Sequence, residues 1–136
     1  LEMRHIGGST EHFAQLLAQL PSTFHPQEFF LAKHLELRQR HTKFENAPYA
    51  LEPNCKESPG GLRDLHTILW VAKAANLGHD WHELAQHGIL TNLEAQQLER
   101  NETTLFQIRA RLHGVAGRHE DRLLFDLQTA VALSLG

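Results

Sequence analysis

The chain has 136 residues, a net charge of −3 and a hydrophobic content of 41%. A domain of this length removes roughly two thirds of its unfolded surface from water, which excludes disorder and any need for disulfides. The slight acidity argues against a dedicated nucleic-acid-binding protein, and no apolar run is long enough to span a membrane. The single Cys55 cannot form an internal disulfide, so we expect a reducing, cytoplasmic setting.

The first eight residues differ from the rest of the chain. Residues 1–6 alternate apolar with polar side chains, which is the period of a strand, and two glycines follow them. A lone strand has no partner in this sequence. We therefore expect residues 1–8 to be the end of a preceding sheet domain and residues 9–136 to form a separate helical domain.

From residue 9 onward the hydrophobic pattern is helical. Capping residues or a proline mark the helix starts, and prolines or glycines mark the ends. Six helices are predicted: from Ser9 or Thr10 to Pro21, from Pro26 to about Phe44, from Leu62 to before Gly78, from Asp80 to Gly88, from Thr91 to about Ala116, and from a cap at Asp121 through Leu135. Asp80 with Glu83 and Thr91 with Glu94 form predicted capping boxes. The fold class is therefore an all-α bundle of five or six helices.

The junction between a long loop, residues 46–61, and the following helix carries the strongest chemical signal. Gly60 and Gly61 leave backbone N–H groups at a helix start, where the dipole favours an anion. Lys56 and Arg63 add positive side chains suited to phosphate or carboxylate, and Asp64 can orient one of these cations. The pattern predicts an anion site. A proline-glycine turn, pinned by an Arg–Asp pair, explains the same residues equally well.

A second charged cluster surrounds the predicted turn at Gly117. Its members are Arg109, Arg111, His113, Arg118, His119, Glu120, Asp121 and Arg122. Arginines in this number suit an anionic partner, and we take Arg109, Arg118 and Arg122 as a candidate partner surface. A self-satisfied salt-bridge network at a helix corner is the more common alternative.

Other patterns give weaker signals. His79, His82 and His87 have a spacing that invites a zinc site, but neither cysteine nor paired carboxylates accompany them, so we expect structural or surface histidines and no metal. Cys55 lies beside Lys56, which can lower a thiol pKa, but no base is identifiable. No phosphate loop or dinucleotide fingerprint is present in the sequence.

Two stretches resemble one known family. Residues 51–70 read LEPNCKESPGGLRDLHTILW, and residues 118–126 read RHEDRLLFD. Both closely resemble motifs of the bacterial PII uridylyltransferase/uridylyl-removing enzymes, in which an N-K-E-x-P-G-G-L-R-D-L-like stretch follows the nucleotidyltransferase domain. Cys55 stands where the family pattern leads us to expect valine. Residues 1–7 are similar to the end of the family's nucleotidyltransferase sheet.

The resemblance implies a segment of a multidomain, cytoplasmic nitrogen sensor. Such an enzyme transfers UMP from UTP to a tyrosine of the PII signal protein, uses Mg²⁺, and removes the UMP when glutamine is plentiful. This chain would be the helical domain between the nucleotidyltransferase core and the hydrolytic HD domain. The family's G-S loop, D-x-D carboxylate pair, HD metal site and ACT domains are absent from the sequence. The chain alone is therefore expected to hold no catalytic residue, to bind no cofactor and to be inactive.

Two functional hypotheses follow. In the first, the helical domain assists UMP transfer. The residues expected to face the UTP phosphates are Lys56, Gly60, Gly61, Arg63 and Asp64. In the second, the chain is a non-catalytic interaction or spacer domain that docks PII or a neighbouring domain. Its docking surface is then the cluster around Gly117 or the solvated basic side of the second helix, formed by Lys33, Arg38, Arg40 and Lys43.

Overall fold

A computed structural model describes residues 3–23, 25–44 and 50–136. Within those ranges six α-helices form and no strand does. The helices are α1 (Thr10–Thr23), α2 (Pro26–Lys43), α3 (Leu62–Ala74), α4 (Trp81–Gln86), α5 (Asn92–Ala116) and α6 (Phe125–Leu135). None of these described helices combines the length and the apolar character that crossing a membrane requires. The prediction of an all-α helical fold is confirmed.

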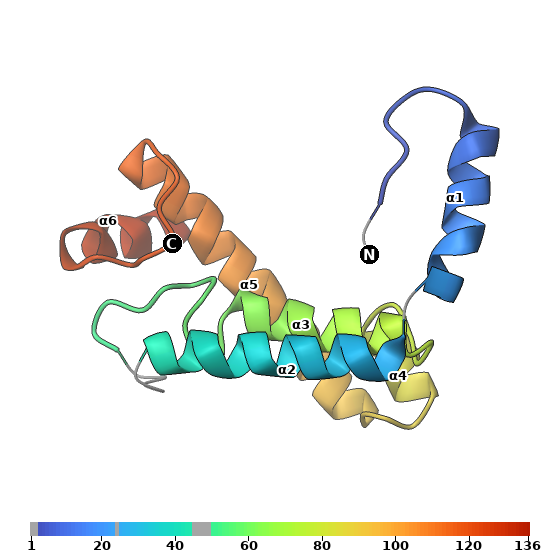
Figure 1. Cartoon of the computed structure of the whole chain (residues 1–136). Coiled ribbons are helices and arrows are strands. Elements are labelled where there is room, and N and C mark those ends of the chain that lie inside the picture. Colours follow the sequence, from blue (N-terminus) through green and yellow to red (C-terminus); the bar gives the residue numbers. More distant parts are fainter. Residues whose placement is uncertain (1–2, 24, 45–49) are drawn as a thin grey trace.

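The long helix α5 runs from α4 at one end of the helical body to α6 at the other (Figure 1). Helices α2 and α3 lie side by side, and α5 packs against α3, α4 and α6 (Figure 1). Helix α1 stands apart from this body, and residues 3–8 before it are irregular (Figure 1). Residues 50–61, which precede α3, lie near α5 and α6, and this brings the two charged motifs together at one end of the helical body (Figure 1).

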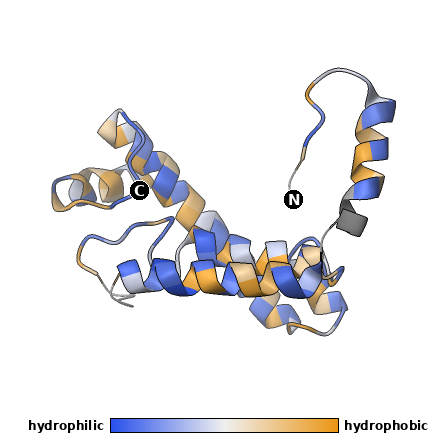
Figure 2. Ribbon diagram, in the orientation of Figure 1, coloured by the Kyte–Doolittle hydropathy of each residue, from blue (hydrophilic) through white to orange (hydrophobic). Residues whose placement is uncertain are grey.

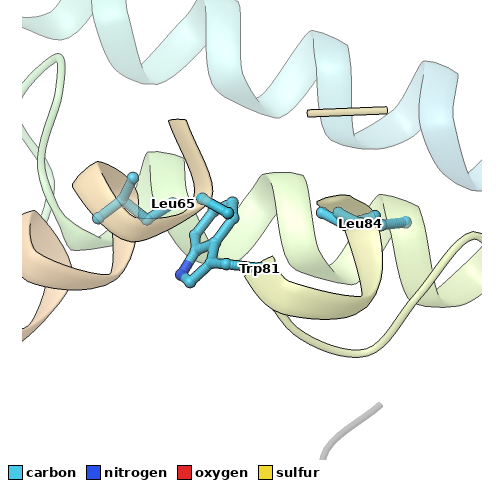
Figure 3. Packing of buried hydrophobic residues seen from close by; sticks show 5 residues of the cluster. Leu65, Trp81 and Leu84 are labelled. Carbon is cyan, nitrogen blue, oxygen red and sulfur yellow. The ribbon is translucent and has the colours of Figure 1, made fainter. Parts of the chain in front are cut away.

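Two clusters of buried side chains hold the body together. The first consists of Leu65, Ala72, Trp81, Leu84 and Ala95, from α3, α4 and α5 (Figure 3). The second joins Leu112 of α5 and Val131 of α6 to Cys55, which precedes α3. Because Cys55 belongs to this second cluster, the segment before α3 is anchored in the core between α5 and α6.

Most predicted helix starts are confirmed because local capping chemistry fixes them. Thr91 and Glu94 form the predicted capping box of α5, and the glycine after α5 ends it in the left-handed conformation. Asp80 caps α4 by accepting the N–H of Glu83 at 2.8 Å. The reciprocal bond differs from the prediction, since the Glu83 carboxylate accepts the N–H of His79 instead of that of Asp80.

Two predicted boundaries are wrong. Helix α1 continues past Pro21 to Thr23, so the proline lies in its last turn, where it removes one hydrogen bond and crowds the carbonyl four residues earlier but does not end the helix. Helix α6 begins at Phe125 with Leu124 in the N-cap position, so Asp121 does not cap it. Asp121 accepts hydrogen bonds from side chains of α5 instead.

An apolar groove lies between α2, α3 and the segment around α4. It has a volume of about 310 Å³, and apolar residues recur along α2 and α3 beside it (Figure 2). In its lining, the side chains of Phe30, Ile68, Leu77 and Ile89 are 44–49% exposed. A contiguous apolar surface of this kind commonly marks an interaction site.

Candidate functional site

The segment before α3 folds into a turn whose carbonyl oxygens cap the helix. Gly61 N–H donates to Ser58 O, Leu62 N–H to Cys55 O and Arg63 N–H to Lys56 O, at 2.8, 3.0 and 2.8 Å. The N–H of Gly60 donates to Asp64 Oδ2 at 2.8 Å. The N–H groups at the start of α3 are therefore used within the chain. The expectation that Gly60 and Gly61 leave open N–H groups for an anion is wrong, because the Asp64 carboxylate accepts the first and the carbonyl of Ser58 accepts the second.

The two glycines serve this turn for different reasons. Gly60 has a φ of +79°, a left-handed conformation that side chains with a Cβ adopt at a cost. At Gly61 a Cβ atom would lie 2.9–3.0 Å from the backbone oxygens of Ser58, Cys55 and Lys56. Gly60 thus provides the backbone angle, and Gly61 provides the close approach that closes the turn.

Asp64 joins α3 to the end of α2. Its Oδ1 accepts a hydrogen bond from the Arg40 guanidinium, and its Oδ2 lies 2.8 Å from His41 Nε2. The Arg40 side chain is only 7% exposed, so the prediction that Arg40 lies on a solvated basic side is wrong. The expectation that Asp64 orients Arg63 is also wrong, because partners on α2 and the Gly60 N–H engage both of its oxygens.

Lys56 and Arg63 share one carboxylate at the edge of the turn. Glu57 Oε1 lies 3.2 Å from Arg63 Nη2 and 3.8 Å from Lys56 Nζ. Lys56 Nζ also lies 3.9 Å from Asp121 Oδ2. Both distances from the ammonium exceed hydrogen-bond length. Within the described ranges, the Lys56 ammonium therefore has ion-pair neighbours but no hydrogen-bonded acceptor, and its side chain is 31% exposed.

Asp121 is the centre of the second charged cluster. Its Oδ1 accepts a hydrogen bond from Arg109 Nε at 2.7 Å and lies 3.1 Å from His113 Nε2. Its Oδ2 lies 3.5 Å from His119 Nε2. Close by, Arg118 pairs with a neighbouring glutamate at 2.8 Å. The salt-bridge network expected as one interpretation of this cluster is therefore present, and the partner surface stays a prediction.

The surroundings of Asp121 favour its ionised form. Burial is the largest single influence and raises the pKa of this carboxyl. The hydrogen bonds from Arg109 and His113, with the positive charges of Arg109 and His119, outweigh burial and lower the pKa below its usual 3.8. A depressed pKa in the folded state means that the ionised carboxylate stabilises the fold.

Replacing Asp121 by asparagine should therefore make the free energy of unfolding vary less with pH in the acid range. The carboxylate contributes fully above its unfolded pKa, and this contribution is lost as the pH falls through the folded pKa. We expect Asp121→Asn to lower the free energy of unfolding by about 1–3 kcal/mol at pH 7, with a smaller difference below about pH 3. Urea denaturation of both proteins at a series of pH values measures this difference. A difference of the same size at pH 7 and below pH 3 would contradict the assignment.

The two charged motifs pair through their backbones. The N–H of Cys55 donates to the carbonyl of Asp121 at 2.8 Å, and the N–H of Leu123 donates to the carbonyl of Pro53 at 2.9 Å. An isolated antiparallel bridge lies between these bonds. The side chain of Lys56 adds the ionic contact between the motifs. Sequence reasoning missed this pairing because neither stretch shows the alternation typical of a strand.

The structure groups potential metal ligands differently from the sequence pattern. The three histidines within residues 79–87 do not form a ligand group in the described part of the chain. Ligand atoms of His113, His119 and Asp121 lie within 4.8 Å of one another. Because the Arg109 guanidinium already binds the carboxylate of this group, its positive charge disfavours a metal cation there.

Cys55 is a core residue. Its side chain is buried with Leu112 and Val131. Burial raises the pKa of the Cys55 thiol, and the nearby charge of Asp121 raises it further. The thiolate that a reactive cysteine requires is therefore disfavoured, and the position contributes packing instead.

Comparison with known proteins identifies the family. The model of the GlnD PII-uridylyltransferase family matches residues 28–136, which include both charged motifs. The whole chain is 59% identical to a bifunctional uridylyltransferase/uridylyl-removing enzyme of Cupriavidus pinatubonensis, and 55% and 54% identical to those of Burkholderia mallei and Burkholderia orbicola. It spans 16% of the length of each relative. No solved structure matches it significantly. The resemblance expected from the two motifs is confirmed, and the chain belongs to the GlnD PII-uridylyltransferase family.

Proposed function

We propose that this chain assists the transfer of UMP from UTP to a tyrosine of the PII protein, as a helical part of a longer cytoplasmic uridylyltransferase. The family membership supports a role in a transferase. One observation carries the proposed role: Lys56 and Arg63 are partly exposed cations fixed on a turn with an internally bonded backbone. The phosphate contacts would thus be made by side chains and not by backbone N–H groups.

Side chains in this position are suited to binding phosphate oxygens. The Lys56 ammonium has donors that are not committed to a hydrogen bond in the described structure. Arg63 can exchange its contacts with Glu57, 3.2 and 3.4 Å long, for shorter charge-assisted hydrogen bonds to a phosphate. Catalysis of phosphoryl transfer depends mainly on positioning and charge stabilisation, so these residues would accelerate the reaction without bonding covalently to substrate.

Mg²⁺ would be held elsewhere in the full-length enzyme. The carboxylates of Glu57, Asp64 and Asp121 each lie within 4 Å of an arginine or lysine. A site that already holds these cations does not fit a divalent ion, so these three carboxylates are not expected to bind Mg²⁺. Gly60, Gly61 and Asp64 would contribute by shaping and anchoring the turn.

Arg63→Ala in the full-length enzyme tests this role. We expect the rate of UMP transfer to fall about tenfold or more, which corresponds to about 1.4 kcal/mol of activation free energy. The uridylyl-removing activity and the melting temperature should change little, since the Arg63–Glu57 pair is partly exposed and its contacts are long, at 3.2 and 3.4 Å. Arg100→Ala on α5 is the control, because it removes the same charge from an exposed position outside the turn. An unchanged transfer rate in Arg63→Ala would refute the phosphate contact.

The apolar groove favours a second candidate function, docking of PII or a neighbouring domain. Phe30, Ile68 and Ile89 leave much of their apolar surface in contact with water. The relatives of this chain are about six times longer, so a large part of such an enzyme is available to cover the groove. A normal transfer rate in Arg63→Ala would favour this candidate over the phosphate contact.

A further inference from the structure

We propose that the turn before α3 and the turn at residues 117–122 form a single binding surface for a polyphosphate chain, with Lys56 at its centre. The ligand class is a nucleoside triphosphate or inorganic triphosphate. This inference rests on the proposed function and adds to it the second charged motif, in particular Arg109, Arg118 and His119. The motif would then bind substrate phosphates and not a protein partner.

Shared carboxylates place the cations of both motifs in one continuous row. Arg63 and Lys56 meet at Glu57, and Lys56 and Arg109 meet at Asp121. Three permanently charged cations thus share two carboxylates. The chain as a whole has a net charge of −3, so this excess of positive charge is local. A row of cations of this kind matches several linked phosphate groups better than a single one.

Asp121 has more basic neighbours than one carboxylate can neutralise. Arg109 Nε makes the closest contact with the Asp121 carboxylate, at 2.7 Å, and Lys56 Nζ lies farther from it, at 3.9 Å. Arg109 Nη2 also lies 3.3 Å from His119 Nε2. The donors of Lys56 therefore remain available to an incoming oxygen.

The two carboxylates of this cluster lie inside, and the basic side chains of Arg118 and His119 lie outside. The side chain of Glu120, which pairs with Arg118, is 17% exposed. The Asp121 side chain is 10% exposed, whereas those of His119 and Arg118 are 68% and 65% exposed. An anion approaching from solvent would therefore meet Lys56, Arg118 and His119 before it met Asp121. Asp121 would act as a positioning residue that holds Arg109 in the row.

Titration of the 136-residue chain with inorganic triphosphate, at constant ionic strength, tests the proposal. Calorimetry would give the dissociation constant for each variant. We expect Lys56→Gln to weaken binding about tenfold, and the double variant Arg118→Gln/His119→Gln to weaken it about threefold or more. Arg100→Gln on the exposed side of α5 removes the same charge elsewhere and should bind like the unmodified chain.

Three results would overturn the proposal. The first is unaltered binding by the Arg118→Gln/His119→Gln variant, which would remove the second turn from the site. The second is equal affinity for sulfate and triphosphate, which would indicate attraction to charge alone. The third is equally tight binding of an acidic peptide, which would indicate a protein partner. In each case, a loss of UMP transfer in Arg63→Ala would still support the proposed function, so the two failures can be distinguished.

Discussion

Asp64→Ala should destabilise the chain by about 3–5 kcal/mol, because it leaves a buried cation without its counter-charge. The Arg40 side chain is 7% exposed, and its Nε has no hydrogen-bond partner in the described structure even with Asp64 present. The substitution also removes the acceptor of the Gly60 N–H and the partner of His41. Urea denaturation at pH 7 measures the loss as a decrease in the free energy of unfolding.

Removal of both charges provides the control for this prediction. In the double variant Arg40→Met/Asp64→Leu no buried charge remains, so much of the lost stability should return. A loss below about 1 kcal/mol in Asp64→Ala would show that Arg40 reaches solvent or another partner. The role of Asp64 as an anchor between α2 and α3 would then be wrong.

Gly61→Ala should lower the free energy of unfolding by about 2–4 kcal/mol, through steric overlap and weakened hydrogen bonds. The added Cβ would lie 2.9–3.0 Å from three backbone oxygens. The oxygens of Cys55 and Lys56 accept the first N–H groups of α3, and that of Ser58 accepts the N–H of Gly61, so they cannot move without breaking the cap of that helix. Thermal or urea unfolding of the purified chain measures the effect.

Gly60→Ala is the matched control for Gly61→Ala. A Cβ at Gly60 would meet no atom within 4 Å, and only the φ of +79° opposes it. We therefore expect a loss of about 1 kcal/mol, the usual cost of this backbone conformation for a residue with a Cβ. If both variants lost the same amount, the close approach of the three carbonyl oxygens at Gly61 would not be the cause.

The helices could largely be predicted because their ends depend on neighbouring residues. Thr91 and Glu94 are three residues apart, and their reciprocal bonds form within one turn of chain. The predicted N-cap at Asp121 is wrong because its role depends on a residue that is distant in the sequence. Aspartate suits both an N-cap and an ion pair, and the choice depends on Arg109, which only the tertiary structure brings within 2.7 Å.

The chemistry of the glycine pair could not be decided from the sequence. At a helix start with two glycines, the N–H groups either stay open to solvent or donate to the preceding carbonyls, depending on where those carbonyls lie. Here the oxygens of Cys55 and Lys56 fold back onto α3. The partner of Asp64 was likewise unpredictable, because Arg40 lies on another helix, 24 residues earlier. The cations Lys56 and Arg63 remain predicted phosphate contacts.

The most direct test of whether side chains or backbone groups face the nucleotide compares Arg63→Ala with Gly60→Ala in the full-length enzyme. Both enzymes are assayed for UMP transfer, with uridylyl removal as the internal check of folding. Our account predicts a transfer rate about tenfold lower for Arg63→Ala and a nearly normal rate for Gly60→Ala, whose added methyl group projects into open space. A normal rate in Arg63→Ala combined with a large loss in Gly60→Ala would contradict it.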